Sequence, residues 1–140
     1  MIRKRSARAL AGGLAVILLL VAASAAYAAV TGHFSGKTNQ RQSISFDVSH
    51  GRVNNLDFHI RDTCPSGHKY AIHDFHFPAI KINSQHKFDG RFKSTSTDAR
   101  VEITGTVFRK QVKGRLAEVR TIGKEHAQCA GVTKYTANKQ

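Results

Sequence analysis

The 140-residue sequence is short of several residue types, and each shortage argues against a class of function. Two cysteines without a C-x-x-C spacing give no support to thiol redox catalysis. The nine acidic residues are scattered and are expected mostly at outward strand positions, which leaves little for paired-carboxylate chemistry. No G-x-S-x-G, P-loop or G-x-G-x-x-G motif is present. The length also excludes a TIM barrel, a full dinucleotide-binding fold or a multidomain enzyme.

The first 30 residues have the pattern of a secretory signal peptide. Residues 1–8 carry four basic residues and no acidic one, residues 9–30 are uncharged, and Ala26-Tyr27-Ala28 fits a small-x-small cleavage site. We therefore expect a signal helix over residues 1–28 and an exported domain over residues 29–140, outside the cell or at its surface. The alternative is an uncleaved membrane anchor, because the uncharged stretch is long enough to span about 30 Å of hydrocarbon. The positive-inside rule then still places the domain outside.

Cys64 and Cys129 are the only two cysteines, and both lie in the part expected to be exported. In an oxidising compartment an isolated pair most simply forms a disulfide. A zinc site built from two cysteines and two histidines is the alternative, but no C-x₂-C pair provides the usual ligand spacing.

Short segments of alternating apolar and polar residues fill the rest of the sequence. Residues 43–49 place Ile44, Phe46 and Val48 on one face, and residues 56–61 alternate in the same way. Period two with β-branched and aromatic residues is typical of half-buried antiparallel strands. No segment after residue 30 shows a sustained helical period. We therefore predict an all-β fold, a single antiparallel β-sandwich or small barrel of seven to nine strands.

Two further segments indicate how the strands connect. The apolar positions change parity across Pro78, so residues 70–77 and 80–83 form either two strands or one strand with a bulge. Residues 105–120 have the pattern of a hairpin, and its central segment contains four basic residues. We predict that these four bind anions: Arg109, Lys110, Lys113 and Arg115.

Basic residues outnumber acidic ones in the expected domain. The chain has a formal net charge of +13; residues 29–140 retain +9, of which +7 falls in residues 86–140. Such a surface attracts polyanions, and no aromatic residues suited to base stacking stand beside the basic ones, so sequence-specific nucleic-acid binding is not expected. The expected partners are an anionic cell-wall polymer, lipid headgroups or acidic polysaccharide. The alternative is that the charge only keeps the domain soluble.

Histidine is frequent, with eight in the chain. Asp74 and His76 share a face of the expected strand, and His59 joins them if its strand is adjacent. These three residues are our candidate ligands for zinc or copper. The alternative is that the histidines are scattered and solvated, because a metal site needs several convergent ligands.

Several segments together resemble a group of small exported bacterial all-β proteins of unknown function. The shared features are residues 32–38 and 44–48, Cys64 near the end of the next strand, a Cys-x-Gly at residues 129–131, and an aromatic strand ending at residues 135–137. Tyr135 stands where such proteins have tryptophan. The resemblance implies a disulfide-tied antiparallel sandwich and supplies no catalytic residues.

These observations favour an exported, non-catalytic binding or structural module with a basic face suited to anionic surfaces. A small secreted enzyme, or a carrier of a metal or ligand that uses a His/Asp cluster, is the alternative, because function resides in sites rather than in folds.

Overall fold

The fold is described from a computed structural model, which defines residues 30–94 and 98–140. The predicted signal segment, residues 1–28, lies outside the described residues. Within those ranges no helix has the length and apolar character needed to cross a membrane. The regular elements are β1 (Gly32–Thr38), β2 (Ser43–Ser49), β3 (Arg52–Thr63), β4 (Lys69–Phe75), β5 (Ile80–Lys81), β6 (Lys87–Ser94), β7 (Ala99–Val107), β8 (Gln111–Ile122), the 3-10 turn η1 (Gly123–Glu125) and β9 (Ala127–Lys139).

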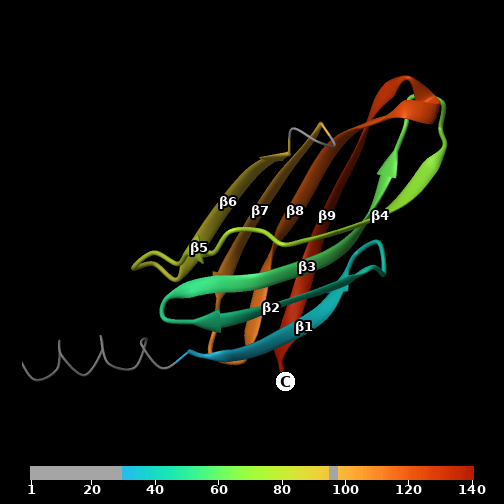
Figure 1. Cartoon of the computed structure of the whole chain (residues 1–140). Helices are drawn as coiled ribbons and strands as arrows, with labels where there is room; N and C mark the ends of the chain where they lie inside the picture. The colour runs from blue at the N-terminus through green and yellow to red at the C-terminus, as the bar shows by residue number, and fades with distance from the viewer. Residues whose placement is uncertain (1–29, 95–97) are drawn as a thin grey trace, which may run out of the picture.

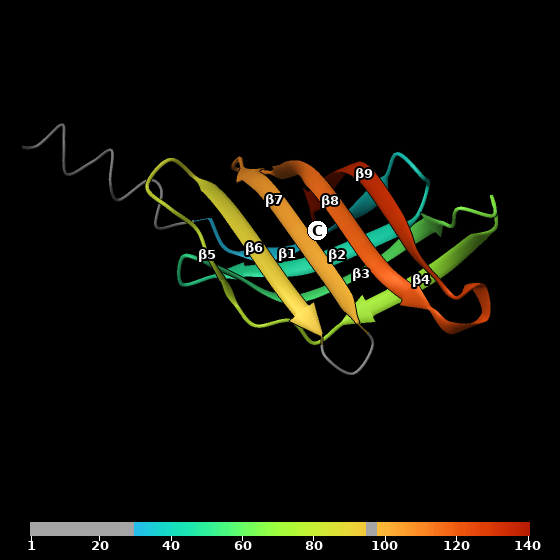
Figure 2. The same cartoon turned by 90° about the horizontal axis from the view of Figure 1, so that it is seen from above.

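All strands belong to one antiparallel sheet that folds back on itself (Figure 1). Its strand order is β4-β3-β2-β1-β9-β8-β7-β6, and β5 pairs with β3. The first and last strands, β1 and β9, join the two halves of the sheet. Figure 2 shows the halves as two layers, with β6–β9 crossing over β1–β4. The predicted all-β, antiparallel fold is confirmed, and its strands form one continuous sheet.

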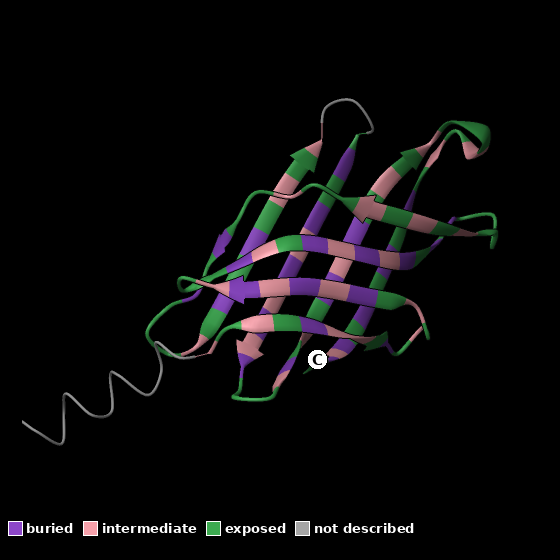
Figure 3. Ribbon diagram, turned by 60° about the horizontal axis from the view of Figure 1, so that its bottom comes forward, coloured by how far each residue is buried: buried purple, intermediate pink, exposed green. Residues whose placement is uncertain are grey.

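The alternation predicted from the sequence determines which residues form the core. Ile44, Phe46 and Val48 of β2 are buried while their neighbours are partly exposed, and Figure 3 shows the same alternation along the other long strands. The ring of Phe46 lies within 6.4 Å, centroid to centroid, of the rings of Phe88 on β6 and Tyr135 on β9. Because Phe88 and Tyr135 belong to the other layer, this aromatic cluster holds the two layers together.

Close backbone contacts allow the sheet to fold back. A Cβ atom on Gly36 of β1 would lie 1.9 Å from the carbonyl oxygen of Thr136 on β9, so only glycine fits there. At the other end of the fold-back, Thr63 of β3 pairs with Ala130 of β9. Cys64 and Cys129 form the disulfide that was predicted from the isolated cysteine pair, and it lies beside this pairing. The residue that follows β3 is therefore covalently tied to the last strand.

The chain around Pro78 forms two strands rather than one. β4 pairs with residues 57–63 of β3, whereas β5 pairs with Arg52 and Val53 near the start of the same strand. Phe77, in the linker between β4 and β5, stacks on Phe58 of β3 and contacts Phe92 of β6, with centroids 5.4 and 4.9 Å apart. The linker therefore supplies an aromatic side chain that bridges the two layers.

Candidate functional site

Basic residues collect on the outer face of the layer formed by β6–β9. Side chains at alternate positions of these strands point away from the core, because neighbouring positions supply the buried residues. We call this surface the basic sheet face, and its basic members are Lys87, Arg91, Lys93, Arg100, Lys113, Arg115 and Lys134. All seven side chains are exposed.

The strand register places some of these cations directly opposite one another. Arg115 of β8 pairs with Lys134 of β9, and Lys93 of β6 pairs with Arg100 of β7. Like charges at directly opposite positions of an antiparallel pair destabilise a sheet. Among residues 30–94 and 98–140, no carboxylate forms an ion pair with any of these four side chains. The face therefore carries two like-charge pairs without an ion-pair partner, although Glu102 lies diagonally across from Lys93.

The two acidic residues on the basic sheet face are close to Arg91. Asp89 accepts a hydrogen bond from Arg91, at 3.2 Å, and Glu102 is the cross-strand neighbour of Arg91. The hydrogen bond with Asp89 is the main cause that raises the pKa of the Arg91 guanidinium. Asp89 also lines the hollow that contains Arg115 and Lys134, but its carboxylate pairs with Arg91.

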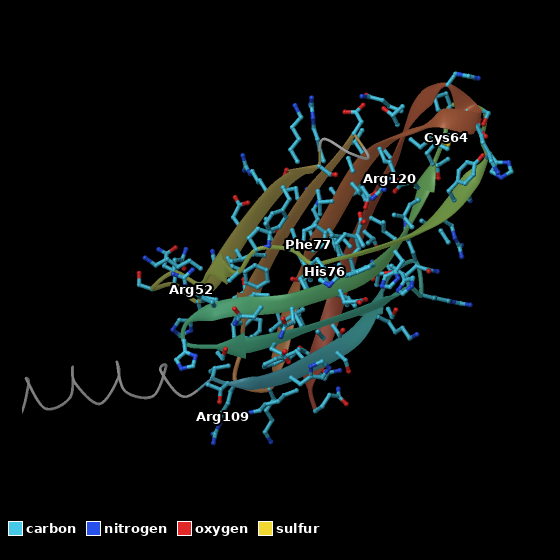
Figure 4. The ribbon with its side chains drawn as sticks, in the orientation of Figure 1. Arg52, Cys64, His76, Phe77, Arg109 and Arg120 are labelled. Carbon is cyan, nitrogen blue, oxygen red and sulfur yellow. A yellow bond between two sulfur atoms is a disulfide. The ribbon has the colours of Figure 1, made fainter. Side chains whose placement is uncertain are left out.

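A shallow hollow of about 660 Å³ lies on this face beside Lys113, Arg115 and Lys134, with Lys87 on its opposite wall. Of the four predicted anion-binding residues, Lys113 and Arg115 are on the face, whereas Arg109 and Lys110 are exposed in the β7–β8 turn, where Figure 4 labels Arg109. Sequence reasoning did not find the contributions of Lys134, Lys93 and Arg100. These residues become neighbours only through the strand register.

A second group of charges lies between the layers. Asp62 of β3 and Glu118 of β8 are 0 and 1% exposed, although the sequence suggested that acidic residues lie mostly outward. Arg120 of β8 donates to Glu118 at 2.6 Å and also donates to Asp74 of β4. Figure 4 shows Arg120 between β8 and β4. We call Asp62, Asp74, Glu118 and Arg120 the carboxylate cluster.

Several carboxyl oxygens of the carboxylate cluster have no hydrogen-bond donor within reach in the part of the chain that the structure describes. Both oxygens of Asp62 and Oε2 of Glu118 are buried without a hydrogen-bond partner in the described residues. Burial raises the pKa of Asp62 from 3.8 to about 6, against the opposing effect of Arg120. Burial likewise raises the pKa of Glu118 from 4.5 to about 7, and the neighbouring charges of Asp62 and Asp74 add to this rise.

A hollow of about 510 Å³ opens next to this cluster, with Phe77 and Phe92 among its walls. Asp74 and Arg120 line it, but they pair with each other. Arg91 and Lys93 of the basic sheet face also line this hollow, so it lies at the edge of that face.

The predicted metal ligands His59, Asp74 and His76 do not converge. Asp74 faces the interior and pairs with Arg120, whereas His59 lies on the outer face of the same layer. His76 follows the end of β4 and has a positive φ of 66°. Phe75 is 49% exposed, so the even-numbered positions of β4, including Asp74, face the interior and do not share the outer face with His59.

A different group of potential ligands meets on that outer face. Asp57 and His59 of β3 and His73 of β4 offer ligand atoms that all lie within 4.8 Å of one another. No other group of three or more such residues is found within residues 30–94 and 98–140. The sequence contained the signal for this group, since Asp57 and His59 alternate with the inward residues Leu56, Phe58 and Ile60.

Known proteins offer no counterpart from which a role could be transferred. No family model, no curated protein and no solved structure matches this chain.

Proposed function

We propose that this domain is a non-catalytic binding module that holds an anionic polymer against the basic sheet face. The observation that carries this proposal is the presence of two like-charge cross-strand pairs, Arg115–Lys134 and Lys93–Arg100, on one outer face. Each pair costs sheet stability when no anion is present. A bound anion would relieve that cost, so the arrangement favours polyanion binding over a purely solubilising role.

The distance between the two pairs favours a polymer over a single small anion. They are separated by two strands across the sheet and four residues along it, which corresponds to about 16 Å. A small anion reaches only one pair at a time. A chain of repeating carboxylate, sulfate or phosphate groups reaches both pairs at once, and we therefore infer a cell-wall polymer or acidic polysaccharide as the partner.

Export is part of this proposal. The signal-like pattern of residues 1–28 supports it, and so does the disulfide Cys64–Cys129, because disulfides persist in oxidising compartments. Outside the membrane, wall polymers and acidic polysaccharides are the abundant polyanions. The resemblance to small exported bacterial all-β proteins points to the same location.

The test is salt-dependent binding to heparin and to polyphosphate by the wild type and by the double variant Arg115→Gln/Lys134→Gln. Each phosphate or sulfate contact releases about one counterion. We expect the slope of log K against log salt to fall by about two, and the affinity at 0.1 M salt to fall by roughly 60-fold, since this electrostatic contribution vanishes near ~1 M salt.

The matched control is Arg52→Gln/Lys81→Gln. Arg52 and Lys81 are also directly opposite and exposed, but they lie on β3 and β5 in the other layer. This control should retain wild-type binding. Equal loss in both double variants would show that only net charge matters, and unchanged binding in Arg115→Gln/Lys134→Gln would refute the proposed face. Tighter binding to anionic lipid vesicles than to either polymer would also contradict a polymeric partner.

A further inference from the structure

We propose that Asp57, His59 and His73 form a binding site for a divalent transition-metal ion on the outer face of β3 and β4. His59 and His73 are directly opposite in the strand register, and Asp57 is two residues from His59 on the same face. Two imidazole nitrogens and one carboxylate oxygen therefore lie within 4.8 Å of one another. This site is separate from the basic sheet face, which lies on the other layer.

The spacing of His73 and Asp57 already suits coordination. Nε2 of His73 lies 3.1 Å from each carboxylate oxygen of Asp57. Two ligands that bind one tetrahedral ion at about 2.0–2.1 Å are about 3.3 Å apart. An ionised carboxylate only accepts hydrogen bonds, so Nε2 of His73 donates the hydrogen in this contact. On metal binding that hydrogen moves to Nδ1 through solvent, and Nε2 and Asp57 then both face the ion.

His59 has an orienting partner of its own. Its Nδ1 lies 2.9 Å from the hydroxyl of Ser43 on β2, which leaves Nε2 available as the metal ligand. Metal-binding histidines commonly use their second nitrogen in this way, because the hydrogen bond fixes the ring orientation. The rings of His59 and His73 are stacked with centroids 4.1 Å apart. An imidazole nitrogen donates in the plane of its ring, so both rings must tilt toward the ion.

Four of the other histidines lie at turn-like backbone positions instead of in a cluster of potential ligands. His50, His76, His86 and His126 all have positive φ values, a conformation in which histidine is enriched relative to most residues. His33 pairs with Asp47 at 2.8 Å, but Asp47 also accepts a hydrogen bond from Asn55. This pair supplies only two ligand atoms, and it therefore serves as the natural comparison for the proposed site.

The donor set indicates the class of metal. Two imidazoles and one carboxylate suit borderline ions such as Zn²⁺ and Cu²⁺ and do not favour Mg²⁺ or Ca²⁺, which prefer oxygen ligands. Water completes the coordination, because the site is open on the surface. The general order of divalent affinities places Cu²⁺ above Zn²⁺.

The test is calorimetric titration of the purified protein with CuCl₂ and ZnCl₂, together with electron paramagnetic resonance of the Cu²⁺ form. We expect one equivalent of metal per chain, tighter binding of Cu²⁺, and a spectrum with two equatorial nitrogens. His59→Ala and His73→Ala should each weaken binding at least tenfold, and His73→Ala should leave one nitrogen. Asp57→Asn should weaken binding while retaining both nitrogens.

His33→Ala is the matched control, because it removes a histidine from the two-ligand pair on the same layer. It should bind metal like the wild type. The proposal is overturned if His73→Ala binds Cu²⁺ as tightly as the wild type, or if His33→Ala loses as much affinity. It is also overturned if Mg²⁺ competes with Zn²⁺ at equal concentration. Far-UV circular dichroism shows whether each variant is folded, and since His73 is exposed we expect its replacement to leave the fold intact.

Discussion

Replacing Asp62 with asparagine should change how the stability of this domain depends on pH. The Asp62 carboxyl is fully buried, and its pKa rises from 3.8 to about 6 because burial disfavours its charged form. The folded chain therefore holds this proton more tightly than the unfolded chain does. Asp62 contributes its full stability below pH 3.8, and that contribution is lost as the pH rises through about 6.

The size of the effect follows from the two pKa values. The difference between 3.8 and about 6 corresponds to about 3 kcal/mol of unfolding free energy across the whole titration. About 2 kcal/mol of this change in unfolding free energy occurs between pH 4 and pH 8, where unfolding can be measured. Asparagine has a similar shape and does not ionise, although its amide also lacks a partner. The free energy of unfolding of Asp62→Asn minus that of the wild type should therefore rise by about 2 kcal/mol from pH 4 to pH 8.

Urea unfolding followed by far-UV circular dichroism measures this difference, and the absence of tryptophan makes fluorescence the weaker probe. Asp89→Asn is the control, because Asp89 is exposed on β6. The difference in unfolding free energy between Asp89→Asn and the wild type should change little from pH 4 to pH 8. The reasoning fails if the Asp62→Asn difference stays constant from pH 4 to pH 8, or if it is larger at pH 4.

Two other perturbations test the fold-back of the sheet. Replacing both Cys64 and Cys129 with alanine removes a cross-link between positions 65 residues apart, and the loop-entropy model predicts a loss of about 4 kcal/mol in urea unfolding. A loss below 1 kcal/mol would show that the unfolded chain is already compact around this region. Gly36→Ala would force a Cβ atom to within 1.9 Å of the Thr136 carbonyl oxygen, so β1 and β9 must separate there. We expect more than about 3 kcal/mol of destabilisation and faster amide exchange in β9. Exchange in β9 at the wild-type rate would contradict this account.

Local patterns made much of the secondary structure predictable. The alternation of residues 43–49 coincides with β2, and the hairpin expected over residues 105–120 is formed by β7 and β8. These predictions succeed because period two is a local property of a half-buried strand. The pairing of β1 with β9 has no local signal. It depends on segments separated by most of the domain, and for this reason the sequence predicted a sandwich or small barrel without its strand order.

In the candidate sites too, groupings of residues that are close in the chain were predictable, and groupings that depend on strand pairing were not. Cys64 and Cys129 could be paired from the sequence because only two cysteines exist. Lys113 and Arg115 could be grouped because they are close in the chain, whereas Lys134 joins them only through the β8–β9 register. The burial of Asp62 and Glu118 was also not predictable. A carboxylate in an alternating strand is normally placed outward, and these two occupy positions that the pattern otherwise gives to apolar residues.

The pairing of β1 with β9 also constrains when the domain can fold. The N-terminal strand cannot complete its hydrogen bonds until residues 135–139, almost the last of the chain, are present. The bond between Cys64 and Cys129 has the same requirement. Contacts between distant segments slow folding, because loop closure must precede the contacts that stabilise it. The pairing of β1 with β9 is therefore expected to be a late step in folding, after the hairpins that join neighbouring strands have formed.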